Sequence, residues 1–301
     1  AVNAALYRSV LPAENLLLVN TPTRFNSETT KNLARRLAEN LEAPFVELPI
    51  DSFINETVSQ IDDLQIPSPS DMKTLHLTGF MKENIQARDR STRILATLSS
   101  AFGGIFTCNA NKTELTVGYG TLYGDLSGAL AATADLWKHQ IYALGRTLNR
   151  YFDKNMIPDE IFTVRPSAEL SENQDITKGL GDPLIYEYHD FLFRSFIEPW
   201  NRITPEEILT WYSKNCLEEK LGTPVSIKSI FKTHHDFITD LEKWWNLFAG
   251  FAVAKRIQAP PLLAVSRRPY GYDLRESQIA PYYTDTYIHL KNSLLSNGRA
   301  T

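Results

Sequence analysis

The sequence predicts an α/β fold, with a parallel sheet covered by helices on both faces and a helical C-terminal portion. Short apolar runs alternate with amphipathic helical patterns through the first half of the chain, an order that favours parallel strands joined by helical crossovers. The second half lacks strand signals, and no Gly/Ser-rich linker interrupts the chain. We therefore expect one domain over residues 1–301.

The first two elements follow from hydrophobic spacing. Residues 1–10 carry Leu6 and Val10 at helical spacing and predict a helix, although no capping residue or loop leads into it. Residues 16–19 form a short apolar run, which suits a strand buried on both faces. Because the chain opens inside a helix, we expect a preceding segment.

A helix, a strand and a second helix are predicted next. The first helix begins after Asn26 or Ser27, either of which can cap it, and ends before a strand at 45–48. The second helix is capped by Asp51 or Ser52. The apolar positions of the two helices are Leu33, Leu37 and Leu41, and Phe53, Ile54, Val58 and Ile61.

A loop rich in Pro and Ser is predicted at 67–71. A long helix over 83–101 should end at two glycines, followed by a third strand at 105–108 and a helix at 135–151. Ile94, Leu95 and Leu98 form one apolar face of the long helix. The remaining expected elements are helices at 184–198, 205–213 and 227–251, and an irregular tail.

The composition excludes several function classes. With 31 Lys and Arg against 35 Asp and Glu, the net charge of −4 argues against a general nucleic-acid binder but permits a local basic pocket. No apolar run approaches the ~20 residues that span a bilayer, so we expect no membrane insertion. Two cysteines, Cys108 and Cys216, are too few for a disulfide framework, which favours a cytoplasmic setting.

Polar groups follow the third predicted strand, where open α/β sheets bind ligands. Asn109, Asn111, Lys112 and Glu114 offer amides, a cation and a carboxylate to a phosphate and a metal. The stretch 118–125 contains three glycines that let the backbone approach a ligand closely. On spacing alone a structural role is about as probable, with Asn111 as a helix N-cap and Glu114 at the third position of that helix.

A second polar cluster lies at 83–90. Asn84 and Arg88 share one helix face, and a guanidinium suits a bidentate phosphate contact, but a solvated face with Arg–Asp pairs is the commoner arrangement. Lys138 and Ser167 are weaker candidates, because a lone lysine on a helix usually faces solvent and Ser167 can simply start a turn.

The end of the chain carries a basic cluster of Lys255, Arg256, Arg267 and Arg268, which fits an anionic ligand or, equally well, a surface charge run. Cys108 is expected to be a core thiol. The histidines lack the spacing of zinc ligands, and neither the P-loop nor the dinucleotide-binding glycine motif is present.

Together these segments resemble NAD⁺ synthetase, the ammonia-transferring ligase domain, and especially its glutamine-dependent type. The resemblance covers nearly the whole chain, and its motifs are specific in combination although each is weak alone. In the family's order they are ENIQARDR at 83–90, NANKTE at 109–114, GYGTLYGD at 118–125, PSAEL at 166–170 and KRIQAPP at 255–261. The resemblance implies a doubly wound parallel sheet of the ATP-pyrophosphatase (adenine nucleotide alpha hydrolase-like) type.

The resemblance also implies a reaction. ATP adenylates the nicotinate carboxylate of deamido-NAD⁺ and releases pyrophosphate, and ammonia then attacks the adenylate to give NAD⁺ and AMP. Magnesium and cationic side chains are needed, because charge builds on the departing pyrophosphate. The family also implies a homodimer or higher oligomer, with the helix around ENIQAR at a two-fold interface.

The family's functional residues map onto nine positions of this chain. The resemblance assigns catalysis to Lys138 and Asp125, ATP binding to Asn109, Asn111, Lys138 and Ser167, deamido-NAD⁺ binding to Asn84, Arg88, Glu114, Asp125 and Lys255, and metal binding to Glu114.

One family motif is missing. The pyrophosphate-binding loop Ser-Gly-Gly-x-Asp-Ser, which precedes a helix like 1–10 in the family, does not occur here, so we expect the domain to be truncated at its N-terminal edge. The nitrogen source, glutamine or free ammonia, stays open. The alternatives are another ATP-pyrophosphatase amide ligase and an inactive nucleotide-binding or dimerising remnant.

Overall fold

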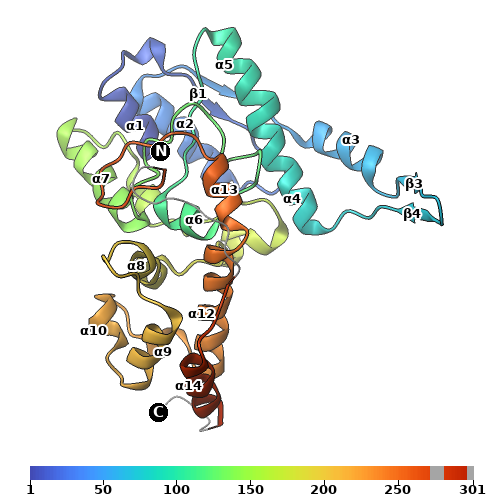
Figure 1. The fold of residues 1–301 in the computed structure, drawn as a ribbon. Coiled ribbons are helices and arrows are strands. Elements are labelled where there is room, and N and C mark those ends of the chain that lie inside the picture. Colours follow the sequence, from blue (N-terminus) through green and yellow to red (C-terminus); the bar gives the residue numbers. More distant parts are fainter. Residues whose placement is uncertain (272–280, 297–301) are drawn as a thin grey trace. The chain divides into compact units, whose positions relative to one another are not determined.

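The computed structural model describes residues 1–271 and 281–296, which group into two compact units (Figure 1). The first unit comprises residues 1–109, 121–130 and 141–183, and the second comprises residues 110–120, 131–140 and the chain from 184 onward. The second unit contains the helical C-terminal portion that the sequence predicts.

A parallel strand pair lies in the first unit. β1 (Leu18–Asn20) pairs with β2 (Phe45–Glu47), and α2 (Glu28–Leu41) connects them. Ser27 caps α2 by accepting the Thr30 N–H, and the predicted leucine face of this helix is buried. Both strands are half-buried, so the expectation of a first strand buried on both faces is wrong.

The core of the first unit joins three helices. α1 (Val2–Arg8) packs on α2 and on α7 (Lys138–Tyr151) through small and branched apolar side chains. Those buried in this core are Val2, Ala5, Leu37, Leu41, Leu148, Met156 and Ile157. Helix 1–10 is thereby confirmed, although it ends earlier than predicted.

The next segment contains a hairpin that the sequence analysis missed. α3 (Asp51–Ile61) follows Ile50, which makes no side-chain cap, so capping by Asp51 or Ser52 is wrong. β3 (Gln65–Pro67) and β4 (Met72–Thr74) pair antiparallel around the predicted loop, at the far end of α3 in Figure 1. Every residue of the two strands is exposed, so they lack the buried alternate positions by which strands are recognised.

The predicted helix at 83–101 is present but compound. α4 (Gly79–Arg88) begins after the cap Thr78, a π-helical stretch covers Asp89–Leu95, and α5 (Ala96–Phe102) ends at Gly103. Ile94, Leu95 and Leu98 are half-buried.

The third predicted strand, at 105–108, is wrong. This segment has no regular secondary structure, and it bonds to residues 129–130: the Cys108 N–H donates to Leu130 O, and the Ala129 N–H donates to Phe106 O. Gly128 allows this pairing, because a Cβ there would lie 2.7 Å from the Cys108 nitrogen. Cys108 itself is buried, as predicted for a core thiol.

The second unit is helical. Its helices are α6 (Lys112–Val117), α8 (Tyr186–Ile197), α9 (Pro205–Ser213), α10 (Leu217–Leu221), α11 (Ile227–Ile230), α12 (His234–Ala249), α13 (Ala252–Gln258) and α14 (Asp285–Ser296), together with the start of α7. Capping boxes at Thr204 and Thr233 begin α9 and α12. Buried aromatic side chains of α8 and α12, including Phe193 and Trp244, form its core.

The predicted C-terminal helices are confirmed with two changes. The helix at 227–251 is divided into α11 and α12, because Phe231 leaves the helical conformation before the Thr233 cap. The tail is not irregular throughout, since α14 lies in it, and its residues 272–280 lie outside the described residues. Within the described ranges no helix is both long enough and apolar enough to span a membrane.

Gly118 is required where α6 meets α13. It ends α6 with a φ of +66°, and an added Cβ would lie 2.9 Å from the Cα of Ala252. Both the left-handed backbone and the close approach therefore favour glycine.

We expect Gly118→Ala to lower the free energy of unfolding by about 1 kcal/mol for the left-handed backbone and ~1–3 kcal/mol more for overpacking. Gly222→Ala is the matched control, because Gly222 ends α10 with a φ of +70° and its nearest neighbour, Arg194 Nη2, lies 3.6 Å away. Denaturant unfolding of both variants checks this, and equal losses would contradict the packing argument.

Candidate functional site

Glu114 and Lys138 form an ion pair in the second unit. Glu114 lies in the first turn of α6, whose N-cap Asn111 accepts the Glu114 N–H at 2.9 Å. Lys138 begins α7, and its Nζ lies 3.3 Å from Glu114 Oε1. The capping role of Asn111 is thus confirmed. A solvent-facing Lys138 is wrong, because its side chain is only 20% exposed.

Tyr186 completes this pair. Its hydroxyl donates to Glu114 Oε1 at 3.3 Å, and its ring centroid lies 4.7 Å from Lys138 Nζ. Because Glu114 stands at the positive end of a helix dipole, its negative charge is favoured there. The cluster presents one carboxylate and one ammonium that are both largely shielded from water.

A fully buried ion pair supports the start of α6. Lys112 Nζ lies 2.9 Å from Asp135 Oδ1, 2.7 Å from Ser266 Oγ and 3.0 Å from the Arg268 carbonyl. Asp135 also accepts the N–H groups of Val265 and Ser266. Burial raises the pKa of Asp135, but the hydrogen bonds from Lys112 and Ser266 outweigh it and hold that pKa below its usual value.

The basic cluster near the C-terminus is partly internal. Lys255 Nζ donates to the carbonyls of Gly118 and Gly120 at 2.7 and 2.6 Å, and therefore shapes the glycine-rich loop after α6. Arg256 is buried and donates to the carbonyls of Thr116 and Phe248. Arg256 therefore does not belong to a surface charge run, which was one of the two alternatives for this basic cluster.

In the first unit, three predicted site residues meet one loop. Thr121 donates its hydroxyl to Asn84 Oδ1 at 2.8 Å and its N–H to Asp125 Oδ1 at 2.6 Å. Arg88 donates to the Leu122 carbonyl at 3.2 Å. Asn84 and Arg88 therefore share a helix face, as predicted, and Arg88 is exposed, as the alternative of a solvated face also predicts.

Ser167 and Asn109 make local contacts in the same unit. The Ser167 hydroxyl donates to the Gln174 carbonyl and accepts the Glu169 N–H, so it starts a turn. Glu169 has a φ of +46°, and its buried carboxylate accepts hydrogen bonds from the region of the Ser27 cap. Asn109 Oδ1 accepts a hydrogen bond from Asn3 at 2.8 Å.

The first unit contains a group of side chains that could bind a metal ion. Among the described residues, Asp62, Asp63 and His76 are the three whose ligand atoms lie within 4.8 Å of one another, but Asp62 already accepts from Lys82 and from the Leu77 N–H. Glu114 offers a single carboxylate, which matches Mg²⁺, since that ion keeps several waters and shares substrate phosphates.

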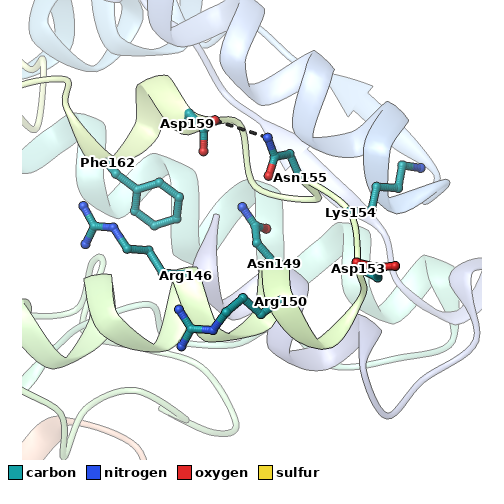
Figure 2. Close-up of a pocket in the computed structure, with 8 residues that line it drawn as sticks. All are labelled: Arg146, Asn149, Arg150, Asp153, Lys154, Asn155, Asp159 and Phe162. Carbon is teal, nitrogen blue, oxygen red and sulfur yellow. Dashed lines mark hydrogen bonds between the residues drawn. The ribbon is translucent and has the colours of Figure 1, made fainter.

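A cavity of about 560 Å³ lies beside the last turns of α7 (Figure 2). Arg146 lies over the ring of Phe162 at 4.9 Å, and Asn155 donates to Asp159 on the facing segment. None of the nine predicted site residues is among the residues that line this cavity.

The parallel strand pair β1–β2 and the helix α2 that connects its strands place the first unit in the α/β class. A solved glutamine-dependent NAD⁺ synthetase from Cytophaga hutchinsonii shares this fold, with a TM-score of 0.62 and 20% identity over 92% of this chain and 40% of its own. The family model described as NAD synthase matches residues 1–229, and the chain belongs to that family.

Two curated relatives illustrate the family. The glutamine-dependent NAD⁺ synthetase of Thermotoga maritima is 32% identical over 68% of this chain and 33% of its own length. The NH₃-dependent NAD⁺ synthetase of Helicobacter hepaticus is 31% identical over 73% of this chain and 75% of its own. The chain spans about a third of the length of the glutamine-dependent Thermotoga relative.

Several polar residues that hold these groups in place were not predicted from the sequence. Asp135, His139, Asp190 and Glu169 each contact residues distant in sequence, and their own spacing gives no signal for those contacts. Lys112 and Glu169 lie within the NANKTE and PSAEL motifs, which draw attention to them although their burial could not be predicted.

We expect Asp135→Asn to lower the free energy of unfolding by about 3–5 kcal/mol at neutral pH, because it removes the buried counter-charge of Lys112 and leaves only the more distant Glu198 carboxylate, 3.7 Å from Lys112 Nζ. A lowered pKa stabilises the folded state above the ordinary value of 3.8, and this contribution is lost as the pH falls through the lowered pKa. The difference between wild type and variant should therefore shrink below pH 3.8.

Urea unfolding from pH 7 to pH 2 measures this difference. Asp62→Asn is the control, because the pKa of Asp62 is also lowered but its ion pair with Lys82 is far more exposed, and its unfolding curve should change little. A pH-independent difference for Asp135→Asn would contradict the ion-pair argument.

Proposed function

We propose that the protein carrying this chain makes NAD⁺ by ATP-dependent amidation of deamido-NAD⁺ through an acyl-adenylate, releasing AMP and pyrophosphate. The observation that carries the proposal is the Glu114–Lys138 pair in the first turns of α6 and α7, at the positions where the family resemblance assigns phosphate and metal contacts. Membership of the NAD synthase family supports the same reaction.

Lys138 is the proposed phosphate ligand. Its ammonium, at the positive end of α7 and partly shielded from water, exchanges the Glu114 carboxylate for the charge of the departing pyrophosphate. Asn109, Asn111 and Ser167 keep their assignment to ATP, although Asn111 and Ser167 also make structural hydrogen bonds.

Glu114 is the proposed metal ligand. Mg²⁺ bound to it would neutralise charge on the triphosphate. Release from Lys138 frees the carboxylate oxygen that the metal needs, and the hydroxyl of Tyr186 holds that oxygen in place.

Residues of each unit are proposed to contact deamido-NAD⁺. In the first unit, Asn84, Arg88 and Asp125 surround the Thr121 loop, with Asp125 as the second catalytic residue. In the second unit, Glu114 and Lys255 keep their assignment to deamido-NAD⁺, and Lys255 also holds the glycine loop.

The nitrogen source is ammonia, from solution or from a glutaminase domain, and the relatives include both types. We favour glutamine, because the chain's motifs are nearest to the glutamine-dependent type. A cytoplasmic setting is consistent with a sequence that contains two cysteines, Cys108 and Cys216, too few for a disulfide framework.

We also propose a homodimer through the helix around ENIQAR, where Ile94, Leu95 and Leu98 are half-buried and Phe102 is exposed. Sedimentation velocity at micromolar concentration should show dimers, and a purely monomeric protein would count against this interface.

A pyrophosphate-release assay on the intact protein tests the function. We expect release that needs Mg²⁺, ATP and deamido-NAD⁺ together, with NAD⁺ formed on addition of ammonia. Release with a different carboxylate and none with deamido-NAD⁺ would support the other amide ligase, and no release with either would support an inactive remnant.

We expect Lys138→Ala to lower kcat and kcat/KM together by roughly 10²–10³-fold, because the contact strengthens as charge develops on the leaving group. Lys228→Ala on α11, an exposed lysine of the same unit, is the control and should stay within about twofold of wild type. Steady-state kinetics with both substrates saturating decide this, and a near-wild-type Lys138→Ala would remove Lys138 from the site.

A further inference from the structure

The start of α7 is capped by side chains from other helices. The first N–H groups of a helix have no partner within it. The Lys138 N–H donates to Thr113 Oγ1 at 3.1 Å, and the His139 N–H donates to Asp190 Oδ2 at 2.8 Å. The preceding residue, Trp137, has no acceptor in its side chain. α7 thus obtains its cap from α6 and α8.

Asp190 is the centre of this cap. Its side chain is fully buried. One carboxylate oxygen accepts the Thr113 hydroxyl, and the other accepts the His139 N–H and lies 2.8 Å from His139 Nδ1. The His139 ring is further fixed by stacking on Phe191. A buried carboxylate with several donors is a rigid acceptor, because each bond restricts the others.

The N-terminus of α7 lacks the acidic residues that usually stabilise this end of a helix. α7 begins with two basic residues, Lys138 and His139, and has no acidic residue in its first turn. Basic side chains are disfavoured at the positive end of a helix. Asp190 supplies negative charge at that point from α8. Sequences depart from such local preferences mainly where function requires it.

We propose that Asp190 is a positioning residue for Lys138, an inference that rests on the proposed function. Asp190 fixes the first turn of α7, and Thr113 links that turn to α6 one residue before Glu114. Lys138 Nζ and Glu114 Oε1 are thereby held 3.3 Å apart before any substrate binds. The ammonium then meets the developing pyrophosphate without reorganisation of the helix end.

A double-mutant cycle on the intact protein tests the proposal, with Asp190→Asn, Lys138→Ala and the double variant. In the wild-type background Asp190→Asn should lower kcat by about tenfold to a hundredfold and leave KM for deamido-NAD⁺ unchanged. In the Lys138→Ala background the same change should cost less than about twofold, because the group that Asp190 positions is already absent.

Asp240→Asn is the matched control. Asp240, on α12 of the same unit, pairs with His189 Nε2 at 3.0 Å and accepts from Trp244 Nε1 at 2.8 Å. This change also removes a carboxylate from an Asp–His pair, so it should lower the melting temperature, but its effect on kcat should be the same in both backgrounds. Thr113→Val, which breaks the cap from α6, replaces Asp190→Asn if that variant does not fold.

Equal losses from Asp190→Asn in both backgrounds would show a purely structural role and overturn the proposal. If the wild-type protein releases no pyrophosphate with deamido-NAD⁺, the proposed function fails, and calorimetry with inorganic pyrophosphate then tests the positioning alone. Asp190→Asn should weaken pyrophosphate binding by about tenfold in wild type and leave it unchanged in Lys138→Ala. The proposal would be overturned if the losses of pyrophosphate affinity from the two changes were additive, or if Lys138→Ala bound pyrophosphate as tightly as wild type.

Discussion

The second unit depends on the burial of one ammonium group. Lys112 is fully enclosed, and an enclosed charge costs several kcal/mol unless its partners compensate for the lost water. Asp135 supplies the counter-charge. Ser266 Oγ and the Arg268 carbonyl accept hydrogen bonds from the same Lys112 ammonium. Residues more than 100 positions apart must therefore meet, which fixes the first turn of α6 and the segment that covers it.

The first turn of α6 also determines where the Asn111 cap and the Glu114 carboxylate lie. Asn111 and Glu114 lie within two residues of Lys112 in the sequence, so the cap and the largely shielded Glu114 carboxylate are positioned once the buried pair is formed. Glu114 suits the positive end of a helix and Lys138 does not. Under the proposed function, the more highly charged pyrophosphate replaces the Glu114 carboxylate, so the observed ion pair is the resting state of the proposed phosphate ligand Lys138.

Local signals in the sequence predict local structure well. Ser27 and three leucines predict α2, and the predicted bounds of the helix at 205–213 match α9 to the residue. The strand at 105–108 failed because an apolar run does not reveal its hydrogen-bond partner, here the segment beside Gly128. The hairpin β3–β4 was missed because none of its positions is buried.

In the candidate site, too, local features could be predicted from the sequence and contacts between helices could not. The cap Asn111 and the shared face of Asn84 and Arg88 follow from spacing alone, since each depends on residues three or four positions apart at one helix. The pair Glu114–Lys138 joins two helices and was not predicted, although the family resemblance singled out each of its residues. Asp190 was not predicted, because its partners come from α6 and α7, and the sequence does not indicate which helices meet.

The β3–β4 hairpin also has consequences for self-association. A two-stranded ribbon leaves the outer edge of each strand open, and open edges invite pairing with another chain. Pro67 removes one N–H donor from β3, and Lys73 places a charge at the centre of β4. These two residues discourage edge-to-edge stacking at the most exposed strands of the first unit, so the ribbon can remain uncovered at high protein concentration without seeding aggregates.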